Sequence, residues 1–202
     1  SNDLFPQERD ENPSCAARSV SNDFEPVDGV MPIETARETQ LRSIWRHMTF
    51  TMRFHKQPSP AVGDFTTESG TLVTAESVER GRGVFTAVGC ALCHTPMLRT
   101  SAIAQSPALR DQPVRLFSDL LLHDMGKELA DGVQQGAAGG DDFRTAPLWG
   151  VGQRIFLLHD GRTTDIVAAI AAHGGEARRV RKQFYALDAT AQQDLINFLR
   201  AQ

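Results

Sequence analysis

The sequence contains few of the patterns that mark membrane, nucleic-acid-binding or sheet-rich proteins. No apolar run approaches the about 20 residues of a membrane-spanning helix, so we expect no membrane span. The 21 lysines and arginines are outnumbered by 25 acidic residues and form no basic stripe, which argues against nucleic acid as a partner. Strand-like alternation is scarce and no internal repeat occurs, so we expect a mostly α protein.

Cysteine is scarce as well, and the positions of its three occurrences are informative. Cys90 and Cys93 belong to the pentapeptide Cys-x-x-Cys-His, whereas Cys15 stands alone near the start. A zinc site would need a second cluster of ligands, and no other cysteine pair exists. A thioredoxin-like dithiol would need a βαβ setting, of which the sequence shows no sign. Haem attachment therefore explains the pentapeptide better than either alternative.

The spacing within this pentapeptide has a chemical reason. Two thiols three positions apart at the start of a helix can reach the two vinyl groups on one edge of a single porphyrin. The next residue, His94, then lies beneath the iron as its proximal ligand. We therefore expect one covalently bound haem c per chain, attached to Cys90 and Cys93. Cys15 is left over as an ordinary loop cysteine, a free thiol or a residue with a partner outside the chain.

Hydrophobic periodicity predicts a few helices separated by long loops. Residues 1–74 comprise an irregular arm up to about residue 32 and a packing helix at 33–56. Residues 75–202 begin with a helix at 75–88, which Thr74 caps and Gly89 breaks directly before Cys90. Further helices are expected at 164–172, at 176–185 and after Asp188, the last with a buried face at Leu195, Ile196, Phe198 and Leu199. The predicted fold class is mostly α, a class I cytochrome c-like haem domain with an extended N-terminal arm.

The residue that binds the iron opposite His94 decides the chemistry. An iron with two protein ligands transfers electrons, whereas an open iron can bind peroxide or a gas. His173 lies at the end of an apolar helix, and the two glycines after it let the chain turn away. Met125 is the alternative ligand, because a His–Met pair is the commonest arrangement in cytochromes c. His123 as the ligand and an open site are the remaining alternatives.

Several further motifs occur in a fixed order from about residue 75 to the end of the chain. They are the pentapeptide with the following Thr95-Pro96, and the segments Phe117–Gly126, Phe143–Gly150, Leu158–Arg162 and His173–Ala177. This ordered set resembles the C-terminal part of the bacterial di-haem oxidoreductase family, described as peroxidases or thiol oxidoreductases. It is more distantly similar to the bacterial di-haem cytochrome c peroxidases and to the MauG-like enzymes.

The resemblance implies a position for the sixth iron ligand. In the peroxidase relatives a His-Asp-Gly turn is followed by a helix, and an axial methionine stands at the end of that helix. Counting from His159-Asp160-Gly161 places His173 at this position. The MauG-like enzymes use a tyrosine there. The resemblance therefore implies that His173 is the ligand, at a position where the ligand's identity varies.

One departure from the family limits what the resemblance carries over. Di-haem members have a second Cys-x-x-Cys-His near the N-terminus for the reactive haem, but Cys15 is followed by Ala16, Ala17 and Arg18. The chain is therefore either the electron-transfer half of a larger protein or a mono-haem form, and peroxidase activity is not carried over.

Covalent haem attachment also predicts a location. It takes place outside the cytoplasm, so we expect a bacterial protein that is periplasmic or otherwise exported. Residues Ser1–Pro6 are neither basic nor apolar, and we therefore expect an export signal that this sequence does not include.

Other side chains in these motifs are candidates for supporting roles. Arg144 and Arg162 can pair with the haem propionates, because an arginine fork matches a carboxylate; the alternative for each is a solvated surface position. His123 and His159 are expected to form hydrogen bonds in the pocket rather than to bind iron. Trp149 is expected to pack in the core.

These observations lead to three functional hypotheses. The preferred one is electron transfer through a six-coordinate haem, which exchanges electrons with a redox partner protein or a second haem domain. The second is a haem peroxidase with a displaceable sixth ligand, in which His123 with Asp124, or Glu176, supplies acid–base chemistry. The third is a haem-based sensor or docking module, with the arm at residues 1–32 as the segment that binds a partner.

Overall fold

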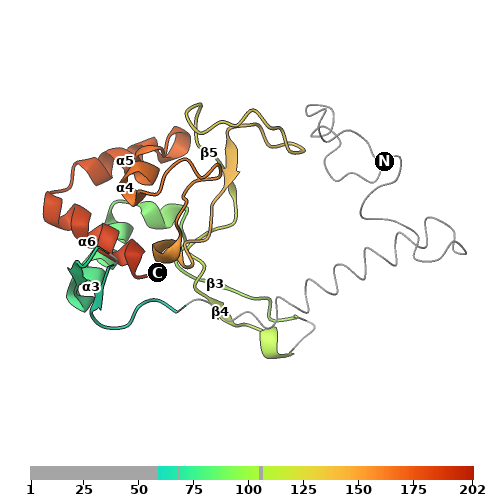
Figure 1. The fold of residues 1–202 in the computed structure, drawn as a ribbon. Helices are drawn as coiled ribbons and strands as arrows, with labels where there is room; N and C mark the ends of the chain where they lie inside the picture. Colours follow the sequence, from blue (N-terminus) through green and yellow to red (C-terminus); the bar gives the residue numbers. More distant parts are fainter. Residues whose placement is uncertain (1–58, 68, 105–106) are drawn as a thin grey trace, which may run out of the picture. The chain divides into compact units, whose positions relative to one another are not determined.

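The structure is a computed structural model that describes residues 59–67, 69–104 and 107–202 (Figure 1). The predicted arm, Cys15 and the predicted helix at 33–56 lie outside these residues. The chain divides into two compact units, of which one holds Gln57–Gly132 and Gly140–Gln202 and carries every helix described below.

The described residues form four α-helices: α3 (Ala75–Ala87), α4 (Ile166–Ala171), α5 (Arg178–Tyr185) and α6 (Ala189–Arg200). The predicted caps are confirmed, because Thr74 accepts a hydrogen bond from the Ser77 N–H and Asp188 accepts one from the Ala191 N–H. Helix α4 begins later than expected, since the carboxylate of Asp165 caps it. None of the described helices has the length and apolarity that crossing a bilayer requires.

The described residues also contain six short strands that the sequence did not predict. They are β1 (Phe65–Thr66), β2 (Leu72–Val73), β3 (Leu98–Arg99), β4 (Pro113–Val114), β5 (Leu122–Asp124) and β6 (Asp142–Arg144). They pair as three antiparallel ladders, β1 with β2, β3 with β4 and β5 with β6. Strands of two or three residues are too short to show alternation. The four helices expected in this part of the chain are present, but the expectation of a mostly α class is not confirmed, because these ladders and long loops separate them.

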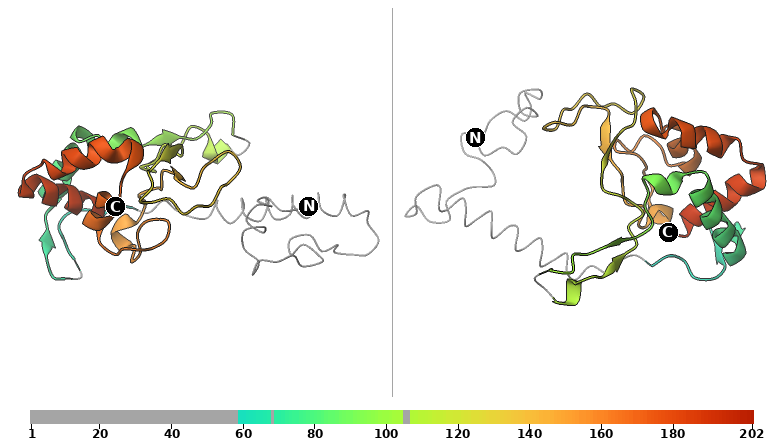
Figure 2. Two further views of the ribbon diagram at one scale, coloured as in Figure 1. Left: turned by 90° about the horizontal axis from the view of Figure 1, so that it is seen from above. Right: turned by 180° about the vertical axis from the view of Figure 1, so that it is seen from behind.

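Helices α3 and α6 lie side by side and form the centre of the core (Figures 1 and 2). They approach so closely that a Cβ added to Gly81 would lie 1.9 Å from the backbone oxygen of Asp194. The aromatic rings of Phe85, Phe117 and Phe198 contact one another, with centroids 5.2–6.1 Å apart. Each such buried side chain contributes about 1.5–3 kcal/mol of hydrophobic free energy.

The buried face of α6 is confirmed at Leu195, Ile196, Phe198 and Leu199. The same helix also buries the carboxylate of Asp194. This group accepts hydrogen bonds from Ser77 Oγ at 2.5 Å and from Arg80 Nε at 2.7 Å, both on α3. The hydrogen bonds from Arg80 lower the pKa of Asp194, so the carboxylate stays charged and links the two helices.

Candidate functional site

The Cys-x-x-Cys-His pentapeptide follows helix α3 and begins at the edge of this core. The helix ends at Ala87, and Gly89 follows with a φ of 96°, a left-handed conformation that glycine adopts without steric cost. One turn of 3-10 helix follows over Cys90–Leu92, and the His94 N–H donates to the Cys90 carbonyl at 3.0 Å. The pentapeptide is therefore a single compact turn, which places both cysteines and the histidine beside one another.

The imidazole of His94 is held in one orientation and kept neutral. Its Nδ1 lies 3.0 Å from the carbonyl oxygen of Phe117. Because a carbonyl oxygen only accepts hydrogen bonds, Nδ1 carries the proton and donates a hydrogen bond to it. Burial lowers the pKa of His94 to about 4, although this hydrogen bond opposes the shift. A neutral imidazole whose Nδ1–H is bound by a backbone carbonyl presents the lone pair of Nε2 to a metal.

His173 repeats this arrangement on another element. It follows α4 directly, and its Nδ1 lies 2.8 Å from the carbonyl oxygen of Ala169. Burial lowers its pKa as well, so this imidazole is also neutral at neutral pH. The two histidines thus meet the same requirement for a metal ligand, a fixed tautomer with a free Nε2.

The distance between these two histidine rings suits a shared metal ion. The ring centroids of His94 and His173 lie 6.4 Å apart, with an angle of 49° between the ring planes. A metal–imidazole bond of about 2.0–2.1 Å and about 1.2 Å from nitrogen to ring centre give about 6.5 Å for two rings on opposite sides of one ion. The donor set therefore fits a haem iron between the two histidines.

Two glycines after His173 allow a close backbone crossing. A Cβ on Gly174 would lie 2.6 Å from the Met125 carbonyl oxygen, and a Cβ on Gly175 would lie 2.1 Å from that of Asp124. No larger residue fits at either position without displacing the end of β5. The sequence suggested only that these glycines let the chain turn away, and the structure adds that they admit β5.

The two cysteines are poor candidates for thiolate chemistry. Both are free in the structure, with no disulfide between them. Burial raises the pKa of Cys90 to about 11, and burial followed by the charge of Asp119 raises the pKa of Cys93. The thiols are therefore protonated at neutral pH, whereas a redox-active dithiol or a zinc ligand must be a thiolate.

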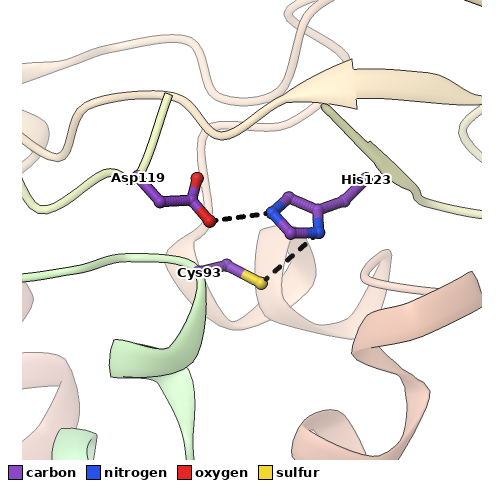
Figure 3. Close-up of side chains that lie close together, drawn as sticks. All are labelled: Cys93, Asp119 and His123. Atoms are coloured by element: carbon purple, nitrogen blue, oxygen red, sulfur yellow. Dashed lines mark hydrogen bonds and ion pairs between the residues drawn. The ribbon is translucent and has the colours of Figure 1, made fainter. Parts of the chain in front are cut away.

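Cys93 lies in a cluster with Asp119 and His123 (Figure 3). Its Sγ is 3.8 Å from His123 Nδ1, and one ligand atom from each of the three residues lies within 4.8 Å of the others. Such a group could hold a metal ion only with a Cys93 thiolate, which the raised pKa opposes. Once the sulfur is a thioether, the cluster retains the carboxylate and the imidazole alone.

The imidazole of His123 is clamped between two carboxylates. Its Nε2 lies 3.0 Å from Asp119 Oδ2, and its Nδ1 lies 2.9 Å from Glu176 Oε2. The hydrogen bond to Glu176, followed by that to Asp119, raises the pKa of His123 against the effect of burial. The same contact lowers the pKa of Glu176. The two carboxylates therefore favour the protonated form of the imidazole beside the Cys93 sulfur.

The clamp on His123 was only partly visible in the sequence. Asp119 precedes His123 by four residues, a spacing that could have suggested the pair. Glu176 lies 53 residues away from His123, and no local pattern links them. It was named above only as a possible acid–base group.

Three further candidate residues, Met125, Arg144 and Arg162, differ in their exposure and contacts. Met125 is half-buried after β5, and its backbone N–H donates to the Asp141 carbonyl at 2.9 Å. Arg144 is exposed at the end of β6. Arg162 already binds Asp160 Oδ2 at 2.5 Å and the Glu128 carbonyl oxygen at 2.8 Å.

The aromatic rings of His159 and Trp149 make different kinds of contact. The ring of His159 stacks on Phe143 with centroids 4.4 Å apart. Trp149 was expected in the core but is only partly buried, and its indole N–H donates to the Arg115 carbonyl. That hydrogen bond holds the indole at the edge of the core, where its polar nitrogen has a partner.

The match to a known family extends over most of the chain. Residues 67–202 match the model of a family described as "Di-haem oxidoreductase, putative peroxidase". The chain belongs to the di-haem oxidoreductase family. The resemblance drawn from the ordered motifs is thereby confirmed, and the match begins at residue 67, slightly before the first of these motifs. Membership implies that the protein binds haem, and the family is typically exported.

Other comparisons add little. No protein with a curated description matches the chain. One solved structure that is similar, at 18% identity and a TM-score of 0.43, is described as "Kuenenia stuttgartiensis Hydrazine Synthase Pressurized with 20 bar Xenon". The alignment covers 85% of this chain and 56% of that one, so the chain spans just over half of that protein's length.

Proposed function

We propose that this member of the family transfers electrons through one haem c, attached to Cys90 and Cys93, with His94 and His173 as the axial ligands. The observation that carries the proposal is the pair of buried, neutral imidazoles whose rings lie 6.4 Å apart. An iron with both axial positions taken by protein side chains passes electrons instead of binding peroxide or a gas.

The haem supplies the one-electron chemistry, and the residues of the chain set its conditions. The carbonyls of Phe117 and Ala169 hold the Nδ1–H groups, so that both Nε2 atoms are available without rearrangement. The buried ring of Phe85 lies 6.4 Å from that of His94, so this side of the site is apolar. Ligation by two histidines should give a lower potential than a His–Met pair.

The proposal extends to the setting of the protein. The haem-binding part would be a class I cytochrome c-like domain of a bacterial periplasmic oxidoreductase. Its electrons would come from a redox partner protein or pass to a second haem domain. The ordered motifs support this setting, because they resemble the C-terminal part of di-haem members and lie within the residues that match the family model.

The test is a spectrum and an intact mass of the protein produced in a host that attaches haem to cysteine. We expect the mass of the chain plus one haem, a low-spin spectrum in both oxidation states, and no carbon monoxide binding by the reduced protein. A high-spin spectrum with rapid carbon monoxide binding would contradict electron transfer through a six-coordinate iron.

The second candidate is a peroxidase in which peroxide displaces His173. The clamped imidazole of His123, with Asp119 and Glu176, favours it as a source of acid–base chemistry near the cofactor. This candidate predicts that the protein turns over peroxide and that His123→Gln lowers the turnover without changing the haem content. An oxidised protein that is inert to peroxide would exclude it.

A further inference from the structure

We propose that the exposed face of α5 is a docking surface for an acidic redox partner protein, at the haem edge attached to Cys93. The inference rests on the proposed function, because it identifies the kind of protein with which the haem exchanges electrons. It is carried by three observations: uncompensated positive charge, a hollow in the surface, and a short chain of contacts to the Cys93 sulfur.

The first observation is the charge on α5. Arg178, Arg179 and Lys182 are exposed, and no ion pair or hydrogen bond of their side chains is recorded within the part of the chain that the structure describes. Arg181 differs, since its guanidinium donates to the Ala171 carbonyl at 2.8 Å. Phe184 anchors the opposite face in the core. The helix thus presents three free cations in a chain whose net charge is −4.

The second observation is a hollow of about 810 Å³ that these cations border. Its walls are formed mostly by α5 and the segment before it: Asp124, Gly175, Glu176, Arg178, Arg179, Lys182, Gln183 and Ala186. The three cations are exposed, unlike the buried polar groups that orient a small ligand in an enclosed pocket. A broad acidic surface is therefore a better match for this face than a small anion.

The third observation connects the hollow with the cofactor. Glu176 lines the hollow, and its carboxylate binds His123 Nδ1 at 2.9 Å. The same Nδ1 lies 3.8 Å from Cys93 Sγ, which is bonded to a former vinyl group in a haem c. The hollow would therefore lie beside the porphyrin edge that is bonded to Cys93. The propionates would extend from another edge of the porphyrin, so a partner's acidic groups are a better match for the cations of α5.

Electrostatic complementarity suits a transient electron-transfer partner. Opposite charges steer the encounter and raise the association rate, and salt screens the effect. A membrane surface fits less well, because Tyr185 is the one large apolar or aromatic side chain exposed on α5. An interfacial helix needs a broader apolar face to insert between lipids.

The experiment uses the holoprotein and a variant with two charges removed, Arg178→Gln/Lys182→Gln. The control is Arg99→Gln/Arg110→Gln, which removes two charges from the hairpin of β3 and β4, where Arg99 binds Asp111 and Arg110 donates to the Ala104 carbonyl. The reduced proteins are mixed with ferricyanide, an anion that takes one electron from the ferrous haem to give ferrocyanide and ferric haem. In parallel, fluorescence anisotropy measures the binding of a labelled peptide of eight glutamates, which needs no electron transfer.

We expect the α5 variant to react with ferricyanide about three- to tenfold more slowly at low ionic strength, and less steeply with salt. It should also bind the glutamate peptide severalfold more weakly, and the control should match the wild type in both measurements. The single variant Lys182→Gln should show a smaller change of the same sign, which keeps the test open if the double variant is unstable.

Equal rates, salt slopes and peptide affinities in the wild type and the α5 variant would overturn the docking surface. Binding to phosphatidylglycerol vesicles without binding to the peptide would also overturn it, in favour of a membrane. A protein that carries no haem, or does not react with ferricyanide at all, would instead contradict the proposed function, while peptide binding would still report on α5.

Discussion

Replacement of His173 by methionine is expected to keep the haem low-spin and to raise its midpoint potential. The rings of His94 and His173 leave room for one iron, and an unbranched thioether can reach into the space of the imidazole. Axial ligands shift haem potentials over about 0.8 V, and one exchange of histidine for methionine should raise the potential by on the order of 0.1 V. At about 59 mV per tenfold change, this is roughly a fiftyfold change in the one-electron equilibrium constant.

The assay is a spectroelectrochemical titration of the wild type and His173→Met, with His173→Ala beside them. The alanine variant has no sixth ligand, so it should be high-spin and bind carbon monoxide when reduced. It also leaves the Ala169 carbonyl without the Nδ1–H, which costs about 1–3 kcal/mol for a buried group. Added imidazole should restore the low-spin spectrum.

The matched control is Met125→Leu, which removes the alternative thioether and keeps the volume of the side chain. Its spectrum and potential should equal those of the wild type. The assignment of His173 is wrong if His173→Ala keeps an unchanged low-spin spectrum. A methionine-to-iron band in the far red of the wild type, lost in Met125→Leu, would assign the ligand to Met125 instead.

Three further predictions concern the fold and the attachment of the cofactor. Gly81→Ala should lower the free energy of unfolding by about 3 kcal/mol, because its Cβ would overlap the Asp194 backbone. Gly83→Ala, whose Cβ would have no atom within 4 Å, should raise the free energy of unfolding by up to about 1 kcal/mol. Urea denaturation measures both changes. Because folding raises the pKa of His123, its protonation stabilises the fold. This contribution is complete below about pH 6.5 and is lost as the pH rises through the pKa of His123 in the folded protein. The difference in unfolding free energy between the wild type and His123→Gln should therefore shrink at high pH. Cys93→Ala should leave a haem bound by one thioether, seen as an altered pyridine haemochrome spectrum with the mass of one haem retained.

The parts of the fold that the sequence predicted are those with a local signal. Thr74 and Asp188 cap helices through their own side chains, and the apolar spacing on α6 identifies its buried face. The pentapeptide needs no tertiary information either, because its chemistry depends on spacing alone. The break at Gly89 directly before Cys90 was also predicted, whereas the turn of 3-10 helix that follows it was not.

The parts that the sequence did not predict depend on contacts between distant residues. The ladder of β5 and β6 pairs His123 with Phe143, across a loop rich in glycine and aspartate. The clamp on His123 joins residues 53 positions apart. Trp149 was expected in the core, but it is only partly buried, and its indole N–H donates to the Arg115 carbonyl.

The end of β5 crosses Gly174 and Gly175 between two parts of the site, the imidazole of His173 and the cluster beside the Cys93 sulfur. The backbone of Gly174 and Gly175 can lie against the carbonyls of Met125 and Asp124 only because neither glycine has a Cβ. The crossing comes directly after α4 and His173 in the chain. Glu176 follows at once and clamps His123, so one short segment positions both the sixth ligand and the group beside the Cys93 sulfur. The crossing involves the backbone and the glycines but not the imidazole of His173. A methionine at position 173 should therefore leave the scaffold in place, which is why its effect on the potential reports on the iron alone.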